Sequence, residues 1–289
     1  MRKLGGAGAG PDRGTVVDEA RRQATAVERK RPFKWLVRVG FLARAVTYGL
    51  VGALALAAAL GAGTAGAAPD QQGALALIAR TPLGRVALIV ICAGLLGYAA
   101  WKLTLGVFGR GPEGAGSFAA KDRISNLAGG VGYLAFFAVA VRILVGGSGK
   151  SSETPSRAAA GVLGWPGGQV IVGLAGAALI GIGLYQVYDA LRGGFADDSK
   201  LGKMNSQQRR LFMAVGRVGL TARALVFGLI GYFLVATAID FNAHQAVGVD
   251  GALARLEHQP LGPWLVGLVA VGLLTFAAFS LFEARYRRL

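Results

Sequence analysis

Long apolar runs alternate with short polar segments along the whole chain. Each run is close to the roughly 20 residues that an α-helix needs to cross a ~30 Å hydrocarbon core. None shows the period-two alternation of a barrel strand that faces lipid, and a spanning helix satisfies its own backbone hydrogen bonds. The pattern predicts an all-α, polytopic membrane protein with six transmembrane helices, at about 36–60, 84–106, 127–146, 168–190, 213–239 and 263–283.

The apolar runs belong to a two-helix unit that occurs three times. Residues 38–45 read Arg-Val-Gly-Phe-Leu-Ala-Arg-Ala and match residues 217–224, which read Arg-Val-Gly-Leu-Thr-Ala-Arg-Ala. In the outer loops, Gly-Ala-Leu-Ala at 73–76 recurs at 251–254. Because a unit of two spans returns the chain to the same side, the repeats are parallel, and a bundle with pseudo-threefold symmetry is expected.

The repeats divide the chain into four parts. The N-terminal segment is rich in Gly and then in charge, which predicts a basic, disordered cytoplasmic tail. Each outer loop is expected to form a short interfacial helix and a turn marked by proline before the second spanning helix begins. The expected boundaries are 1–34 for the tail, 35–110 for the first repeat, 124–192 for the second and 212–287 for the third.

Composition and charge placement indicate the environment and the orientation. Hydrophobic residues make up 54% of the chain and charged residues 16%, below the ~25% typical of soluble domains. The net charge is +16, and most loop Lys and Arg fall in the N-terminal tail, the second and fourth loops and the C-terminal end. The positive-inside rule then makes both termini cytoplasmic. We expect a bacterial plasma-membrane protein that contacts anionic lipids at its cytoplasmic face and has no nucleic-acid partner.

The repeated motifs resemble a known family. The Arg-Val-Gly segments that lead to Arg44 and Arg223, and the Gly-Ala-Leu segment followed by Pro-Leu-Gly, are similar to bacterial integral membrane proteins of domain-of-unknown-function family 1206. The resemblance covers about 33–288 and implies three two-helix repeats. The middle repeat departs most, because Gly129 replaces the arginine. The family has no established activity, so the resemblance implies the fold and no function.

Four of the basic residues within the predicted spans are candidate contact residues. Arg44 and Arg223 occupy equivalent positions inside their spans, past the expected cytoplasmic ends of the helices. A charge there is costly and often functional. Each side chain can snorkel to lipid phosphate or contact another helix, and the sequence leaves these alternatives open. Lys102, near the cytoplasmic end of the second helix, and Arg142, near the outer end of the third, are interpreted in the same way.

Within the predicted spans, acidic residues are found only near the ends. Asp189 and Glu283 occupy equivalent positions there, and a proton-relay carboxylate would lie deeper. Both are expected to form local ion pairs, Asp189 with Arg192 and Glu283 with Arg285 or Arg287.

Residues that could carry chemistry are few. His244 and His258 fall in the last outer loop with Asp250 and Glu257, a weak candidate ligand cluster, because a zinc site needs three or four convergent ligands. Cys92 is the single cysteine, which excludes an internal disulfide. The sequence has no Gly-x-Ser-x-Gly elbow and no Walker-type phosphate loop. We therefore predict no catalytic residue, no cofactor and no metal.

Small residues are expected to mark the faces on which helices pack, since they let helix backbones approach closely in lipid. Spacings of four place Gly173, Ala177 and Gly181 on one face of the fourth helix. Ala93 and Gly97 mark the second helix in the same way.

These observations favour a non-enzymatic helical bundle that has a structural role, assembles with a partner or binds another membrane protein. One alternative is a small-solute or ion transporter or channel, because three like-oriented two-helix units resemble the layout of mitochondrial carriers. The Pro-x-Asp/Glu-x-x-Lys/Arg motif of those carriers is absent from this chain. A third hypothesis is an envelope-lipid enzyme that uses the outer His and acidic residues.

Overall fold

The structure, a computed structural model, describes residues 31–64, 66–108, 120–146 and 154–287. The tail predicted at 1–34 lies outside the described residues up to residue 30, and the first helix already begins at Arg31. The α-helices are α2 (Arg31–Ala59), α3 (Gln71–Ala79), α4 (Gly84–Phe108), α5 (Ala120–Leu144), α6 (Thr154–Leu163), α7 (Gly168–Arg192), α8 (Ser206–Ile239), α9 (Val249–Glu257) and α10 (Gly262–Tyr286). The 3₁₀ turns are η1 (Gly194–Ala196), η2 (Leu201–Lys203) and η3 (Ala243–Gln245).

Within the described ranges, six helices are long and apolar enough to cross a membrane, namely α2, α4, α5, α7, α8 and α10. They coincide with the six predicted runs, so the all-α, polytopic fold is confirmed. The main difference is that α8 has 34 residues and begins several residues before the predicted start. Its N-terminus is fixed by a capping box, in which the side chains of Asn205 and Gln208 each bond to the other's backbone N–H.

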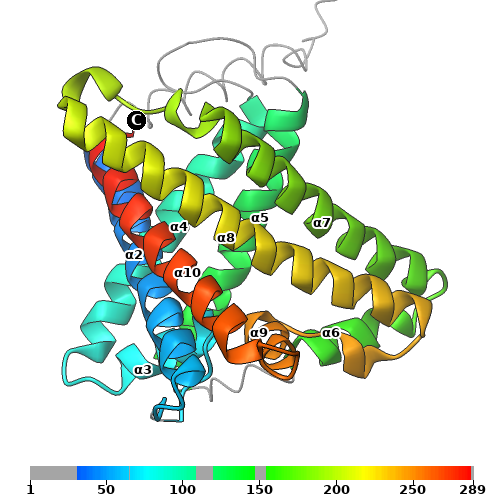
Figure 1. Ribbon diagram of the computed structural model, residues 1–289. Coiled ribbons are helices and arrows are strands. Elements are labelled where there is room, and N and C mark those ends of the chain that lie inside the picture. Colours follow the sequence, from blue (N-terminus) through cyan, green and yellow to red (C-terminus); the bar gives the residue numbers. More distant parts are fainter. Residues whose placement is uncertain (1–30, 65, 109–119, 147–153, 288–289) are drawn as a thin grey trace, which may run out of the picture.

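The six long helices pack in one connected row. The second long helix of each repeat packs on the first long helix of the next, which pairs α4 with α5, α7 with α8 and α10 with α2. Within repeats, α2 packs on α4 and α8 on α10, whereas α5 and α7 are not among the packed pairs of described residues. Figure 1 shows α8 and α10 in front of α4 and α5. Pseudo-threefold symmetry stays a prediction, because the middle repeat lacks the contact that the other two have.

Each loop between the two long helices of a repeat contains, in its described residues, a short helix followed by a turn, as predicted. The short helices α3, α6 and α9 pack against the starts of α4, α7 and α10. Gly84, Gly168 and Gly262 begin these long helices, and a Cβ on any of them would lie only 1.8–2.3 Å from a carbonyl oxygen of the short helix. Pro82 and Pro260 lie in the turns just before them. Glycine is therefore required where the two backbones touch.

Pairs of glycines set the closest helix contacts. A Cβ on Gly40 of α2 would lie 2.5 Å from the carbonyl oxygen of Gly94 on α4. A Cβ on Gly176 of α7 would lie 2.7 Å from the carbonyl oxygen of Gly231 on α8, and the reverse distance is the same. These helices can approach this closely only because neither partner carries a side chain.

The predicted packing faces are partly wrong. On α7, Ala177 is exposed, and a Cβ on Gly181 would meet nothing within 4 Å. Gly173 makes only an ordinary contact with α8. On α4, Gly97 is buried but Ala93 is exposed. In both helices the neighbouring residue is the true contact, because several overlapping stripes of small residues satisfy the same four-residue spacing.

Candidate functional site

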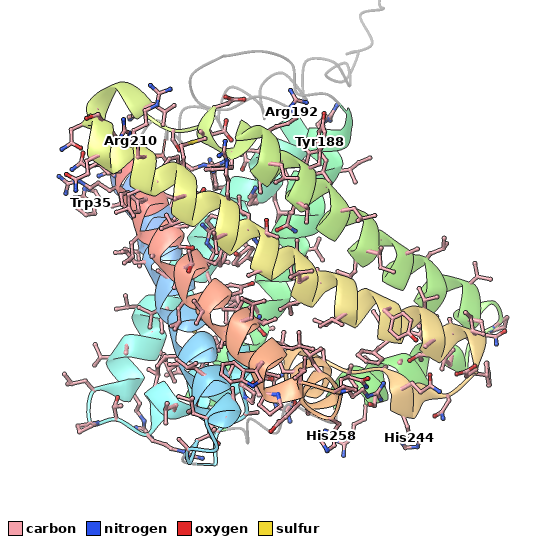
Figure 2. The ribbon with its side chains drawn as sticks, in the orientation of Figure 1. Trp35, Tyr188, Arg192, Arg210, His244 and His258 are labelled. Carbon is pink, nitrogen blue, oxygen red and sulfur yellow. The ribbon has the colours of Figure 1, made fainter. Side chains whose placement is uncertain are left out.

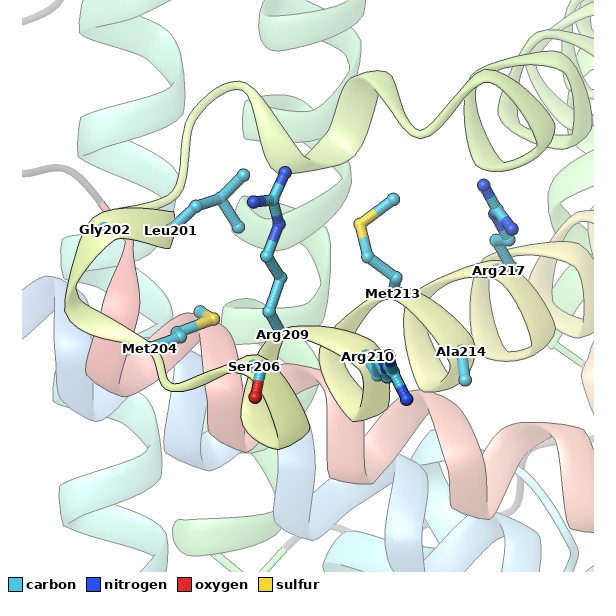
Figure 3. A pocket seen from close by; sticks show the side chains of 9 residues that line it. All are labelled: Leu201, Gly202, Met204, Ser206, Arg209, Arg210, Met213, Ala214 and Arg217. Carbon is cyan, nitrogen blue, oxygen red and sulfur yellow. The ribbon is translucent and has the colours of Figure 1, made fainter.

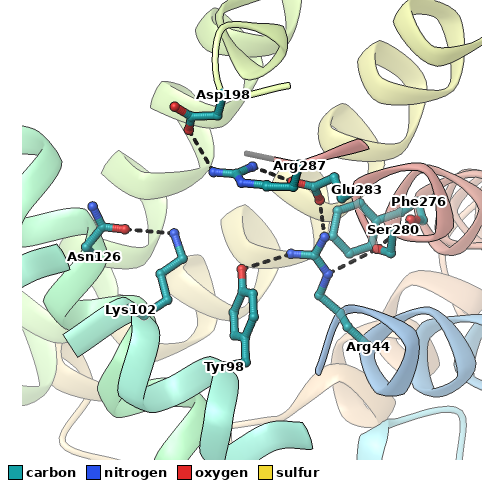
Figure 4. A network of polar contacts seen from close by, with 9 residues as sticks. All are labelled: Arg44, Tyr98, Lys102, Asn126, Asp198, Phe276, Ser280, Glu283 and Arg287. Atoms are coloured by element: carbon teal, nitrogen blue, oxygen red, sulfur yellow. Dashed lines mark hydrogen bonds and ion pairs between the residues drawn. The ribbon is translucent and has the colours of Figure 1, made fainter. Parts of the chain in front are cut away.

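Arg44 is the centre of a buried polar network that joins three helices (Figure 4). Its residue surface is only 4% exposed. The Nε atom donates to the Ser280 hydroxyl of α10 at 3.0 Å, and Nη1 donates to the Tyr98 hydroxyl of α4 at 3.2 Å. Its Nη2 atom forms an ion pair with the Glu283 carboxylate of α10. Arg44 of α2 is therefore held between helices of the first and third repeats.

Aromatic rings surround the Arg44 guanidinium. Its Cζ atom lies 4.9 Å from the centre of the Phe41 ring, 5.6 Å from Tyr98 and 5.1 Å from Phe276. Each such contact contributes about 0.5–2 kcal/mol, with the larger values for desolvated cations. A buried charge pair is stable only where its remaining donors and acceptors are also satisfied, and the two hydroxyls and three rings supply this.

Glu283 extends the network to the C-terminal end of α10. Its carboxylate also pairs with Arg287 one turn later, as the local spacing predicted, and Arg287 contacts the Asp198 carboxylate at 2.7 Å. Burial alone lowers the pKa of Arg287, but the Glu283 and Asp198 carboxylates outweigh it and hold that pKa above its ordinary value. The backbone N–H of Lys200 donates to the Tyr286 carbonyl at 2.8 Å, which fixes the α7–α8 connection against α10.

The second predicted local pair is not formed. Arg192 donates to the Tyr188 hydroxyl at 2.7 Å, and its Cζ lies 5.2 Å from the centre of that ring. A Cβ on Gly194 would lie 2.4 Å from an Asp189 carboxylate oxygen, so the Asp189 side chain lies against η1.

Lys102 joins α4 to α5. Its Nζ donates to the Asn126 side-chain oxygen at 2.8 Å and lies 5.6 Å from the centre of the Trp101 ring. Nearby, Arg123 of α5 donates to the carbonyls of Gly106 at 3.1 Å and Val107 at 2.7 Å. A cation at the last carbonyls of a helix is favoured by the helix dipole, so these contacts hold the end of α4 and the start of α5 together.

Arg223 has a different environment from its equivalent Arg44. Its Cζ lies 5.9 Å from the Tyr48 ring, 4.8 Å from Phe227 and 5.1 Å from Phe276. Phe276 therefore contacts both arginines. The Nε of Arg223 is buried without a hydrogen-bond partner among the described residues. None of the ion pairs found among those residues includes Arg223.

The other candidate residues do not converge. Arg142 is exposed in the last turn of α5. His244 lies in η3 and His258 ends α9; both are exposed and point outward at the end of the bundle away from Arg192 (Figure 2). Asp250 is buried in the first turn of α9, and Glu257 is exposed in its last turn. Across the described residues, no three His, Cys, Asp or Glu side chains are grouped so that they could hold a metal.

A cavity of about 720 Å³ lies at the other end of the molecule, beside the start of α8. Its basic lining comes from Arg209, Arg210 and Arg217 of α8. Its apolar lining includes Leu201 and Met213. Figure 3 shows Arg209, Met213 and Arg217 extending from α8 toward the same side. The sequence did not single out this cavity, because it forms only where the η2 segment folds back beside α8.

The network residues Tyr98, Ser280 and Asp198 were also missed from the sequence. The only signal for this network was the repeat, because the second long helix of one repeat packs on the first long helix of the next. Glu283 and Arg44 lie on two helices that are paired in this way. That signal requires knowing which repeats touch.

Comparisons with known proteins identify the family. The model of Domain of Unknown Function (DUF1206) matches residues 39–109, 124–193 and 218–287, which confirms the resemblance and the three repeats. The chain is 33% identical over 263 residues to the "Uncharacterized protein YxxB" of Bacillus subtilis (strain 168), covering 91% of this chain and 94% of that protein. No solved structure matches. The chain therefore belongs to the DUF1206 family of helical membrane proteins, whose function is unknown.

Proposed function

We propose that this protein is a non-enzymatic membrane bundle that binds anionic lipid at its cytoplasmic face and so provides an assembly point in a bacterial plasma membrane. The observation that carries the proposal is the cavity at the start of α8. Three exposed arginines, Arg209, Arg210 and Arg217, stand beside the apolar Leu201 and Met213. A lipid matches this combination of basic and apolar side chains. Its phosphate accepts charge-assisted hydrogen bonds from guanidinium groups, and its glycerol and acyl parts make apolar contacts.

The proposal includes an orientation in which both termini are cytoplasmic. It is supported by the positive residues at one end of the bundle. There the cavity arginines of α8 lie with Arg123 at the start of α5 and Arg192 at the end of α7. Each Lys or Arg near an anionic leaflet contributes about 1 kcal/mol of attraction.

The lipid-binding test uses the full chain purified in a neutral detergent. We expect phosphatidylglycerol to raise the thermal unfolding temperature more than phosphatidylcholine does, and the variant R209Q/R210Q/R217Q to lose most of that difference. The control variant R80Q/R85Q/R142Q removes three arginines that are exposed at the opposite end, and it should respond as the wild type does. Equal responses of both triple variants would overturn the proposal.

A second test separates a packed bundle from a transporter. In a Cys92→Ser background, single cysteines along α4, α7 and α10 are labelled with a membrane-impermeant thiol reagent from each side. We expect mid-membrane positions to be protected and a cysteine at Gly202 to be labelled from the cytoplasmic side only. Labelling along one helix face through the middle of the membrane would indicate an aqueous path and contradict the bundle, and labelling of Gly202→Cys from outside would contradict the orientation.

A further inference from the structure

The three repeats provide three equivalent interfaces at which the arginine site can be compared. At the α10–α2 interface, Arg44 pairs with Glu283. At the α4–α5 interface, the equivalent residues are Gly129 and Leu105, so both members of the pair are absent. Lys102 extends over Gly129 there, with its Cδ 3.8 Å from where a glycine Cβ would lie. The cation at that interface therefore comes from the other helix.

At the third interface, between α7 and α8, both members of the pair are present but apart. Arg223 is the equivalent of Arg44, and Asp189 is the equivalent of Glu283. The Asp189 side chain lies against Gly194 of η1. Its main electrostatic neighbours are Arg192 and Arg287 together with other carboxylates, and Arg223 is not among them. Arg223 is thus a half-buried cation whose equivalent anion is turned away.

Three polar atoms on the helices around this arginine have no hydrogen-bond partner among the described residues, and Tyr133 is one of the main electrostatic neighbours of Arg223. The Nε of Arg223, the side-chain oxygen of Gln186 on α7 and the hydroxyl of Tyr133 on α5 are all buried without a hydrogen-bond partner in the described part of the chain. Gln186 is the equivalent of Ser280, which accepts from Arg44 Nε at 3.0 Å. At the α7–α8 contact, a Cβ on Gly183 would lie 2.9 Å from the Ala224 carbonyl oxygen, which brings the Gln186 turn to the level of Arg223.

Among the described residues of this region, cations outnumber the carboxylates that pair with them. Among the described residues, the ion pairs found give Arg44 and Arg287 two carboxylates, Glu283 and Asp198. Lys102 is bonded to the neutral side chain of Asn126, and Arg223 contacts only rings. Cation–π contacts leave the guanidinium N–H donors unused, and an ion that is partly removed from water loses hydration at a cost. An anion that accepts from Arg223 would remove this cost.

We propose that Arg223, Gln186 and Tyr133 form an interior binding site for a phosphate group that carries or adjoins a hydroxyl. The phosphate oxygens would accept from the Arg223 guanidinium, whose planar donors match that geometry, and from the Tyr133 hydroxyl. The ligand hydroxyl would donate to the Gln186 oxygen, which has no other donor. A hydroxylated phospholipid headgroup and inorganic hydrogen phosphate both have this chemistry.

The open middle repeat gives such a ligand a route. The contributing helices α5 and α7 are not packed on each other, and only 17% of the most apolar part of each is buried inside the protein. All five neighbouring pairs of the row are closed by packing, and α5 and α7 are its two ends. This site is separate from the cavity beside Arg209, so it stands or fails independently of the proposed cytoplasmic lipid site.

The test measures binding to the full chain in neutral detergent with two probes, inorganic phosphate and mixed micelles that contain phosphatidylglycerol. Phosphatidylcholine micelles and sulfate are the reference ligands. The Arg223, Gln186 and Asp189 variants are made in an R209Q/R210Q/R217Q background, which removes the proposed cytoplasmic lipid site. In this background we expect one bound equivalent, at least tenfold weaker binding after Arg223→Met, and a severalfold loss after Gln186→Leu. Saturation by phosphate assigns the site to a soluble anion, and saturation only by phosphatidylglycerol assigns it to a lipid; either supports the proposal.

Two further variants test whether the loss of binding has a purely structural cause. Arg223→Lys keeps the charge and should retain partial binding, so a folded variant is available even if Arg223→Met does not fold. Asp189→Asn should change binding less than twofold, because its side chain is turned to η1. Unchanged binding after Gln186→Leu and Arg223→Met, absence of binding of both probes to the R209Q/R210Q/R217Q background, or a tenfold gain after Asp189→Asn would overturn the proposal. The last result would show that Asp189 itself neutralises Arg223.

Discussion

Replacing Glu283 by methionine is expected to be among the most destabilising single changes in the chain. Glu283 is 3% exposed and faces Arg44 and Arg287. Arg287 keeps Asp198 at 2.7 Å after the change, whereas Arg44 keeps two hydroxyls and three rings but no anion. Removing one partner of a buried ion pair costs about 3–5 kcal/mol. We expect Glu283→Met to lower the free energy of unfolding by that amount, mainly through Arg44.

Replacing Arg44 in place of Glu283 should lower the free energy of unfolding by less. In Arg44→Met, Glu283 still pairs with Arg287. The loss is then about 1 kcal/mol for each hydrogen bond to Tyr98 and Ser280, or about 2 kcal/mol in total, because the methionine sulfur replaces part of the guanidinium contact with the three rings. The double variant R44M/E283M contains no unpaired buried charge at this position, so it should be more stable than Glu283→Met alone.

The assay is reversible unfolding in mixed micelles of rising dodecyl sulfate content, followed by tryptophan fluorescence. Trp101 reports on the network directly, because the Arg287 Cζ lies 5.4 Å from the centre of its ring. Glu257→Met, a change at an exposed glutamate, is the matched control and should stay within about 0.5 kcal/mol of the wild type. The reasoning is refuted if Glu283→Met is as mild as this control, or if the double variant is no more stable than Glu283→Met.

Three other changes test the packing and the loops by the same assay. Gly176→Ala should destabilise the bundle by about 1–3 kcal/mol, because its Cβ would lie 2.7 Å from the Gly231 carbonyl oxygen, while Gly181→Ala on the same helix meets nothing and should not destabilise; equal effects would contradict the assigned face. Asp70→Ala should cost about 1 kcal/mol, because Asp70 accepts from the Gly73 backbone N–H at 2.7 Å as the N-cap of α3, and Asp70→Asn should recover most of the loss. Replacing His244 and His258 together by alanine should leave both stability and its response to zinc unchanged, and a zinc-dependent shift lost in the variant would reinstate the metal hypothesis.

The sequence determined how long the helices are and where they lie in the chain. The tertiary structure determined how each helix is rotated about its axis. The apolar runs determined the six spans, because crossing a hydrocarbon core demands a fixed length of apolar helix. The repeated motifs determined the three units and the short helix inside each of them, since Gly84 and its equivalents are needed wherever the short helix touches the long one.

Only the tertiary structure decided which face of each helix packs. Lipid-facing and protein-facing surfaces are both apolar in a membrane, so hydrophobicity does not separate them. This is why the stripe through Gly181 was chosen from the spacing while Gly176 makes the contact. The partner of Arg44 was hidden for a related reason. Glu283 lies 239 positions away, and the two meet only because the last helix returns to pack on the first, an arrangement set by long-range packing that the local pattern does not encode.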